Sequence, residues 1–352
     1  MPPLLKSLAC LVILSLPLAA QSAAPASPAP DPLPKNPKDI LALISATHQL
    51  HADGIKPWHL KASFQLYDDK GNPTDKGTLE EFFAGDHRNK RIIISPHFSQ
   101  TEISNQDGDF IEGDTGSMPF FLRLAYEELL NPSPDAKDLA HTSLIKSTRT
   151  FGQTKLTCVM LDQPMKSHEA APLGLFPTYC FDPDAPVLRA FYSLGSTFVG
   201  FNKIGRFLNN DIATSLNVYS DGHLALYLQV DALKTIPEID PALLVASPNA
   251  INSSFALVPV GETLMAGSVI SKVPPRYPDS AKAAHISGEV HLRALIATDG
   301  RIRDLRVIDT PSVDLALASL RAVRFWTYKP YTLNGKPVEV DTTITIHFNF
   351  GF

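Results

Sequence analysis

The sequence has little cysteine, no excess of basic charge and a single long hydrophobic run. Lys and Arg number 31 against 36 Asp and Glu, which leaves a formal net charge of −5 over 352 residues. Without a basic excess there is no field to hold a polyanion, so we expect no nucleic-acid partner. Hydrophobic residues make up 44%, too many for a disordered chain. The length predicts two domains with connecting segments.

The hydrophobic run lies near the N-terminus, from Leu8 to Ala20, and Lys6 precedes it. It is about 13 residues long, whereas a helix needs about 20 to cross a bilayer. A basic residue, a short apolar core and small residues up to Ala24 are typical of a secretory signal. We therefore predict a signal peptide over residues 1–23, a Pro- and Ala-rich spacer over 24–36, and export to the periplasm. The alternative is an uncleaved segment that anchors the protein in the inner membrane.

Cleavage of the signal peptide would remove Cys10 and leave Cys158 and Cys180 as an even pair. In an oxidising compartment such a pair favours a disulfide. Closing a loop of about 22 residues would stabilise the fold by roughly 3 kcal/mol through the unfolded chain. Two unpaired buried thiols remain the alternative.

Residues 37–236 read as two helices among many short strands. Asn36 followed by Pro37 predicts the start of a first helix, with Asn36 as its N-cap. From Trp58 onward apolar residues recur at every second position, and about ten more runs of this kind follow. A second helix is predicted over 118–130, with Ser117 as its cap. This composition predicts an α+β domain: a strongly curved antiparallel sheet or half-barrel whose concave face the helices plug.

The order of these elements, with strands such as PWHLKASFQLYD, GTLEEFF and DGDFIEGD, resembles the half-barrel of the LolA/LolB lipoprotein-sorting superfamily. The resemblance implies an apolar groove for a lipid-like ligand in this domain, although such sheets also serve as plain scaffolds. Residues 237–261 contain four prolines and no sustained period, so they are predicted to be a linker.

Residues 262–352 form a second unit, which carries 11 Lys or Arg and 9 Asp or Glu. A short helix is predicted near Pro278, followed by two strands that the turn Asp299-Gly300 joins into a hairpin. A further helix begins near Pro311 or Ser312. After the turn Asn334-Gly335, strict alternation predicts a last strand.

This unit resembles the TonB C-terminal domain family over about 80 residues. The matching residues are Tyr277-Pro278, Ala281, Ala284, Ile286, Gly288, Val290, Asp299-Gly300, Ala322-Val323, Trp326, Tyr328 and Pro330. The resemblance implies a three-stranded antiparallel sheet with a helix on one face. It also implies that the last strand is an edge to which an extended peptide of a TonB-dependent outer-membrane receptor, or of another envelope protein, adds.

We therefore predict a partner-binding edge in the terminal strand. Its residues are Thr343, Ile344, Thr345, Ile346, His347, Phe348 and Asn349. An unblocked edge strand is an aggregation hazard, and a recruited strand would explain its openness. Two alternatives stay open: the chain's own N-terminal domain covers the edge, or a second copy covers it in a homodimer.

The sequence contains none of the common catalytic or metal-binding motifs. His48, His51 and His59 lie close in sequence without a matching carboxylate, so we expect no metal site. Neither a Gly-x-Ser-x-Gly elbow nor a phosphate-binding Gly-Lys loop occurs, and we expect no enzyme activity and no cofactor. The leading hypothesis is an exported TonB-family protein that docks an envelope partner by strand addition, in energy-dependent transport. The alternative is a LolA-like periplasmic carrier of lipid or lipoprotein with the TonB-like unit as its docking anchor.

Overall fold

The computed structural model describes residues 32–349 apart from residues 53, 87, 135–138, 140–141, 163–170, 194–196, 254–256 and 334. The predicted signal peptide (1–23) and most of the predicted spacer (24–36) lie outside these residues. No helix in the described part of the chain is both long and apolar enough to cross a membrane.

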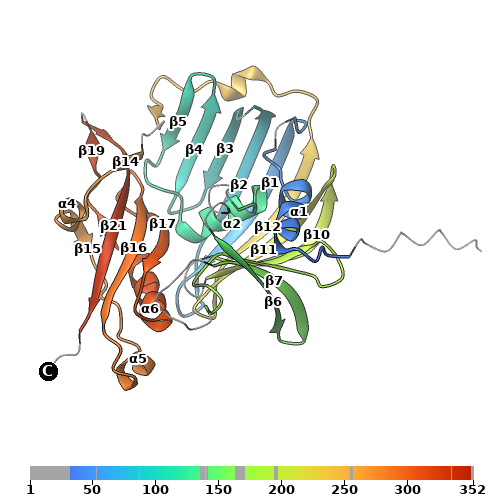
Figure 1. Ribbon diagram of the computed structural model, residues 1–352. Coiled ribbons are helices and arrows are strands. Elements are labelled where there is room, and N and C mark those ends of the chain that lie inside the picture. The colour runs from blue at the N-terminus through green and yellow to red at the C-terminus, as the bar shows by residue number, and fades with distance from the viewer. Residues whose placement is uncertain are drawn as a thin grey trace, which may run out of the picture.

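A single curved antiparallel sheet forms most of the N-terminal domain (Figure 1). Its strands are β1 (Trp58–Tyr67), β2 (Pro73–Gly85), β3 (Arg88–Ile94), β4 (Ser99–Asn105), β5 (Gly108–Gly113), β6 (Ser143–Phe151), β7 (Thr154–Asp162), β8 (Thr178–Phe181), β9 (Leu188–Tyr192), β10 (Phe198–Phe207), β11 (Asn210–Ser220), β12 (His223–Thr235) and β13 (Ile251–Asn252). They lie in the order β13-β5-β4-β3-β2-β1-β12-β11-β10-β9-β8-β7-β6. The sheet is open, so the prediction of a curved half-barrel is confirmed.

Two helices, α1 (Pro37–Thr47) and α2 (Phe120–Leu130), lie against the concave face of this sheet (Figure 1). Alternation in β1 turns Trp58, Leu60 and Phe64 into the core, where the apolar sides of both helices meet them. The indole Nε1 of Trp58 donates to the carbonyl of Leu50 at 2.9 Å. The helices thus bury the apolar part of the concave face.

The predicted N-caps have different outcomes. The side chain of Asn36 accepts from the backbone N–H of Lys38 at 3.0 Å, so it caps α1 as predicted. The prediction for Ser117 is wrong. Helix α2 begins at Phe120, two residues later than predicted, with Pro119 in the N-cap position and no side-chain cap. The backbone N–H of Ser117 instead donates to Asp299 of the C-terminal domain, at 2.7 Å.

The C-terminal domain is built on a second, smaller sheet. Its strands are β14 (Leu257–Pro259), β16 (Gly288–Ile296), β17 (Ile302–Asp309) and β21 (Glu339–Phe348), in the order β14-β21-β16-β17. The shorter elements are α4 (Glu262–Ala266), β15 (Val269–Ser271), α5 (Asp279–Ala283), β18 (Thr327–Tyr328), β19 (Thr332–Leu333) and β20 (Lys336–Pro337). Helix α6 (Val313–Val323) packs on one face of the sheet through Leu315, Leu320 and Val323.

The three antiparallel strands and the helix match the prediction, and the sheet has one more strand than predicted. That strand, β14, pairs with β21 in parallel. The segment 237–261 therefore connects the two sheets directly: a 3₁₀ helix, η1 (Pro241–Leu244), precedes β13, which joins the large sheet beside β5. The segment then reaches the small sheet as β14.

Candidate functional site

The predicted partner-binding residues lie in β21, where alternate side chains point to opposite faces of the small sheet. Ile344, Ile346 and Phe348 are buried in the core beneath α6. The side chains of Thr343 and Thr345 are half-buried and that of His347 is exposed. A partner strand would therefore form hydrogen bonds with the backbone of β21 and would contact the side chains of Thr343, Thr345 and His347.

One edge of β21 pairs with β16 along its whole length, and the other edge is covered over its first part by the chain itself. Strand β14 pairs with Glu339, Val340 and Asp341, and the N–H of Val260 donates to the carbonyl of Asp341 at 3.0 Å. The covered part thus ends before the predicted partner-binding residues Thr343–Asn349. The linker sequence gave no sign of β14, because a three-residue strand that ends in proline shows no period.

Beyond Asp341 the outer edge meets no strand among the described residues, and a carboxylate takes the place of one. Glu262, in the first turn of α4, accepts the backbone N–H of Thr345 at 2.5 Å and its hydroxyl at 3.0 Å. A carboxylate can accept a β-strand N–H without presenting a backbone of its own. The outer edge over Thr343–Asn349 is therefore satisfied at one point by a side chain that a strand could replace.

The predicted disulfide is confirmed. Cys158 and Cys180 are bonded, and they lie directly opposite each other on β7 and β8. Both are fully buried, in a small cluster with Leu156, Ala190 and Tyr192. The bond fixes the pairing of two adjacent strands near the end of the large sheet.

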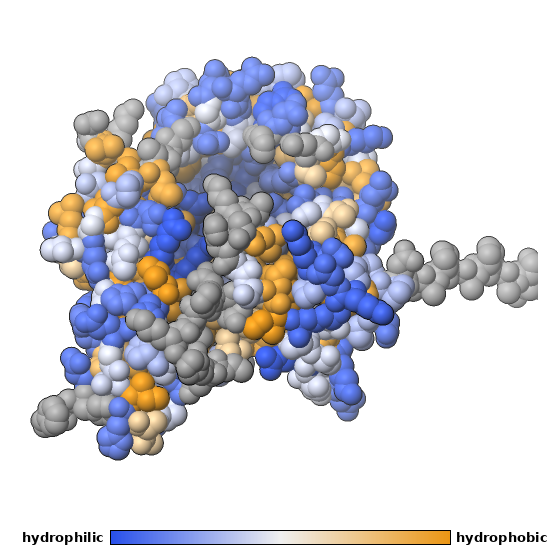
Figure 2. All heavy atoms as spheres, in the orientation of Figure 1, coloured by the Kyte–Doolittle hydropathy of each residue, from blue (hydrophilic) through white to orange (hydrophobic). Residues whose placement is uncertain are grey.

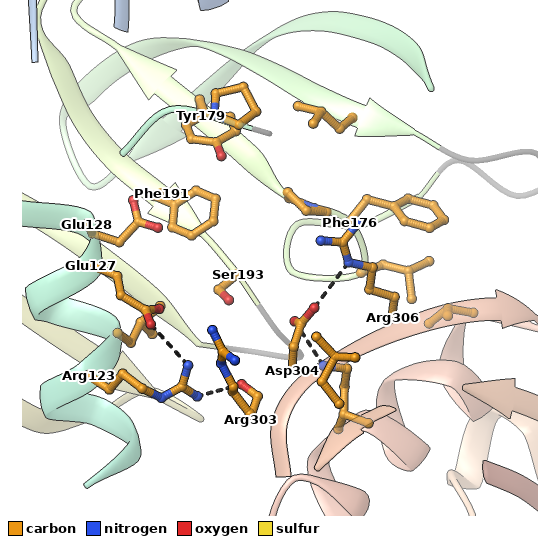
Figure 3. Close-up of a pocket in the computed structure, with 18 of the residues that line it drawn as sticks. Arg123, Glu127, Glu128, Phe176, Tyr179, Phe191, Ser193, Arg303, Asp304 and Arg306 are labelled. Atoms are coloured by element: carbon orange, nitrogen blue, oxygen red, sulfur yellow. Dashed lines mark hydrogen bonds and ion pairs between the residues drawn. The ribbon is translucent and has the colours of Figure 1, made fainter. Parts of the chain in front are cut away.

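A cleft of about 320 Å³ lies between the two domains (Figure 3). One wall is α2, with Arg123, Glu127 and Glu128. The second comes from β8, β9 and the loop before them, with the rings of Phe176, Tyr179 and Phe191. The third is β17, the outermost strand of the small sheet, over residues 303–307. No pattern in the sequence predicts this cleft, because its walls come from both domains.

Each arginine in the cleft lining has a carboxylate partner. Arg123 pairs with Glu127 at 3.2 Å and Arg306 with Asp304 at 3.2 Å. Arg303 binds both carboxylate oxygens of Glu339, at 2.6 and 2.5 Å. The guanidinium of Arg123 also donates to the carbonyl of Arg303 at 2.5 Å and so links α2 to the edge of β17.

Glu128 is the exception in this lining. Its Oε2 atom is buried and has no hydrogen-bond partner among the described residues. Burial, with a smaller contribution from the neighbouring charge of Glu127, raises the pKa of Glu128 well above its usual range. Burial thus favours the neutral form of this carboxyl.

A second polar cluster lies under α2, on the concave face of β2 and β3. Glu81 is fully buried and accepts from Tyr126 at 2.7 Å, from Asn89 at 2.9 Å and from His51 at 3.1 Å. Burial alone would raise the pKa of Glu81, but the hydrogen bond and charge of His51, together with the charge of Arg91, lower it. Every oxygen of this carboxylate is thus satisfied, and the cluster holds α2 to the sheet.

The polar character of the concave face continues outward from Glu81. Arg91, its cross-strand neighbour, lies 4.4 Å above the ring of Tyr126 and pairs with Glu102 on β4. The hollow beside β3 and β4 is accordingly hydrophilic in the space-filling view (Figure 2). This part of the concave face offers charged groups where a lipid chain would need apolar ones.

Arg324, at the end of α6, joins the two domains. Its side chain is buried and donates to Thr197 at 2.8 Å, to Ser220 at 2.8 Å and to Asp221 at 2.9 Å, all in the N-terminal domain. Sequence reasoning missed Arg324, Glu262 and Glu128, because the role of each depends on a contact with a segment distant in the chain.

The candidate metal ligands lie apart from one another. His51 pairs with Glu81 and His59 with Glu80, while His48 is buried against Leu188. Across the described ranges no three His, Cys, Asp or Glu side chains gather closely enough to hold a metal ion.

Comparison with known proteins gives results for each domain. Residues 273–350 match the family model of the Gram-negative bacterial TonB protein C-terminal. Among solved structures, the chain is similar to a LolA superfamily protein from Nitrosomonas europaea, with 8% identity and a TM-score of 0.40 over 60% of this chain and 99% of that one. It is also similar to a domain assigned to outer-membrane lipoprotein sorting from Vibrio parahaemolyticus, with 10% identity and a TM-score of 0.39 over 59% and 96% of the two chains. A DUF1329 family protein from Desulfovibrio piger has 11% identity and a TM-score of 0.39 over 61% and 98%. No curated protein matches the chain.

Proposed function

We propose that this protein is a non-enzymatic docking protein of the bacterial envelope, exported to the periplasm. Its C-terminal domain takes up an extended segment of a TonB-dependent outer-membrane receptor, or of another envelope protein, along the outer edge of β21 at Thr343–Asn349. The match of residues 273–350 to the TonB C-terminal family supports this proposal. So does the edge itself, which has no neighbouring strand beyond Asp341 among the described residues.

The observation that carries the proposal is the contact of Glu262 with Thr345. The backbone N–H of Thr345 points away from β16, toward the position that a further strand would occupy, and a carboxylate satisfies it. An incoming strand would supply a carbonyl at the same point and would displace Glu262. The edge is thus protected in the absence of a partner and can be exposed by moving one side chain.

Docking of this kind would be weak. About five ladder hydrogen bonds give roughly 3–7 kcal/mol before the cost of ordering the peptide, so the affinity is no better than about micromolar. Loss of the charged hydrogen bond from Glu262 lowers it further. Weak binding suits a contact that a transport cycle forms and breaks.

The alternative, a carrier of lipid or lipoprotein, has less support in the structure. The apolar residues of the concave face are buried under α1 and α2, and the face beside them is charged. A bound acyl chain would have to displace a helix from the core.

The experiment measures binding of peptides from the periplasmic N-terminal segments of the receptors encoded by the same genome. We expect Glu262→Ala to strengthen the binding about tenfold, because it removes the group that competes for the Thr345 N–H. Glu112→Ala is the matched control, since Glu112 accepts the backbone N–H of Ser247 at 2.7 Å in the N-terminal domain. Equal affinities of the wild type and Glu262→Ala would exclude docking at this edge, and lipid co-purifying with the exported protein would favour the carrier.

A further inference from the structure

The geometry points to a second binding site, in the cleft between the domains: we propose that Glu128 and the neighbouring aromatic rings bind one organic cation, an amine or guanidinium group. This site is independent of the β21 edge. It requires no movement of Glu262, and no residue of β21 lines it.

The first argument is the balance of charge in the cleft. Its three arginines, Arg123, Arg303 and Arg306, each have a carboxylate of their own. Glu128 is a fourth carboxyl, and no basic side chain among the described residues pairs with it. The three arginines are neutralised by Glu127, Asp304 and Glu339, the last of which lies outside the lining, so an ionised Glu128 leaves one negative charge in excess in this set of groups. One monovalent cation would restore the balance.

The second argument is the state of the Glu128 carboxyl. A buried polar atom without a hydrogen bond is destabilising and is uncommon in folded proteins. Protonation removes the charge of Glu128 but leaves Oε2 unpartnered. A bound ammonium or guanidinium group supplies both a donor and a positive charge, and it would satisfy that atom.

The third argument is the aromatic wall. Tyr179 and Phe191 are stacked with ring centroids 4.7 Å apart, and Phe191 lies beside Glu128 (Figure 3). Aromatic faces attract desolvated organic cations but give inorganic ions no comparable contact. The volume of about 320 Å³ is at the lower end of the range for ligand pockets, so it suits a single side chain or a small amine.

Binding of a cation would be linked to loss of the proton on Glu128. The charged and titratable groups that face it are Glu127 and Arg123 from its own helix, Tyr179 from β8, and Arg303, Asp304 and Arg306 from β17. The ammonium ion and the proton compete for one carboxyl. The affinity should therefore rise with pH, by up to tenfold per unit, as long as Glu128 is protonated in the free protein.

The experiment uses the full chain and two probes that differ in one charged group: Nα-acetyl-lysine methylamide and its norleucine counterpart. We expect the lysine probe to bind at least tenfold more tightly at pH 7.5. Titration calorimetry in two buffers of different ionisation enthalpy measures any proton released on binding. The variant Glu128→Gln keeps the shape of the side chain and should weaken binding at least tenfold. Glu238→Gln, which changes an exposed carboxylate outside the cleft lining, should change it less than twofold.

n-Butylamine distinguishes the two sources of the cation. Equal binding of n-butylamine and the lysine probe would assign a free amine, whereas tighter binding of the lysine probe would assign a basic residue of a peptide. Equal binding of the lysine and norleucine probes would overturn the proposal, as would the absence of binding at the solubility limit. Because the site does not include the edge over Thr343–Asn349, failure here leaves the Glu262→Ala experiment to decide on the proposed docking edge.

Discussion

The buried imidazole of His48 makes the stability of the N-terminal domain depend on pH in a direction that can be tested. His48 follows α1, and its Nε2 accepts the backbone N–H of Leu188 at 3.3 Å. Its Nδ1 must then carry the proton, which it donates to the hydroxyl of Thr47 at 2.7 Å, and that hydroxyl donates to the carbonyl of Leu43. A second proton on the ring would break the contact with β9.

Burial lowers the pKa of His48 from 6.5 to about 4, and the charge of Asp211 only partly opposes this effect. The unfolded chain takes up a proton on this ring below pH 6.5, while the folded chain keeps it neutral down to about pH 4. The stabilisation is therefore complete above pH 6.5 and is lost as the pH falls through this window. The full difference corresponds to about 3 kcal/mol, and about 2 kcal/mol of it is lost by pH 5.

The assay is urea unfolding at pH 7.5 and pH 5.0, followed by the fluorescence of Trp58 in a Trp326→Phe background. Trp58 belongs to the core of the N-terminal domain, so it reports the unfolding of the domain that contains His48. The perturbation is His48→Gln, whose amide oxygen can accept the Leu188 N–H but does not titrate.

We expect His48→Gln to lose about 1 kcal/mol at pH 7.5 through poorer hydrogen-bond geometry. Between pH 7.5 and 5.0 its free energy of unfolding should then fall by about 2 kcal/mol less than that of the wild type. His223→Gln, which removes an exposed imidazole, is the control. Parallel losses in the wild type and His48→Gln would refute the reasoning, because they would show that His48 protonates equally in the folded and unfolded chains.

Three further predictions concern the framework. Gly300→Ala should destabilise the C-terminal domain by about 3 kcal/mol or more in thermal unfolding. Gly300 has φ +82°, and an added Cβ would lie 1.8 Å from the carbonyl oxygen of Tyr328. A loss of stability below about 1 kcal/mol would contradict this prediction. Replacing Cys158 and Cys180 with serine should cost about 3 kcal/mol, and alkylation of both thiols in unreduced, denatured wild type would show that the bond does not form. Arg324→Ala should weaken the contact between the domains by about 2 kcal/mol and speed proteolysis within residues 237–261; an unchanged cleavage rate would show that other contacts hold the domains together.

The sequence by itself determined the elements of both domains. Alternation of apolar and polar residues defined the strands, because successive side chains of a strand point to opposite faces whatever the rest of the fold does. The cap at Asn36 and the turn at Asp299-Gly300 follow from interactions within four residues, which the local sequence specifies. The pair Cys158–Cys180 could be inferred because the predicted cleavage of the signal peptide removes Cys10 and leaves two cysteines. Motif residues of the C-terminal unit indicated its family.

The tertiary structure decided which strands meet and which groups are left without partners. Strand β14 is three residues long and joins β21 in parallel, so neither its length nor its period marks it in the sequence. The carboxylates of Glu262 and Glu128 look alike in the chain. One satisfies a strand edge 83 residues away, whereas the other lies in the cleft between the domains with an oxygen that has no hydrogen-bond partner among the described residues. Burial and pairing of a charge depend on the whole set of neighbours that folding brings together, and no local pattern encodes that set.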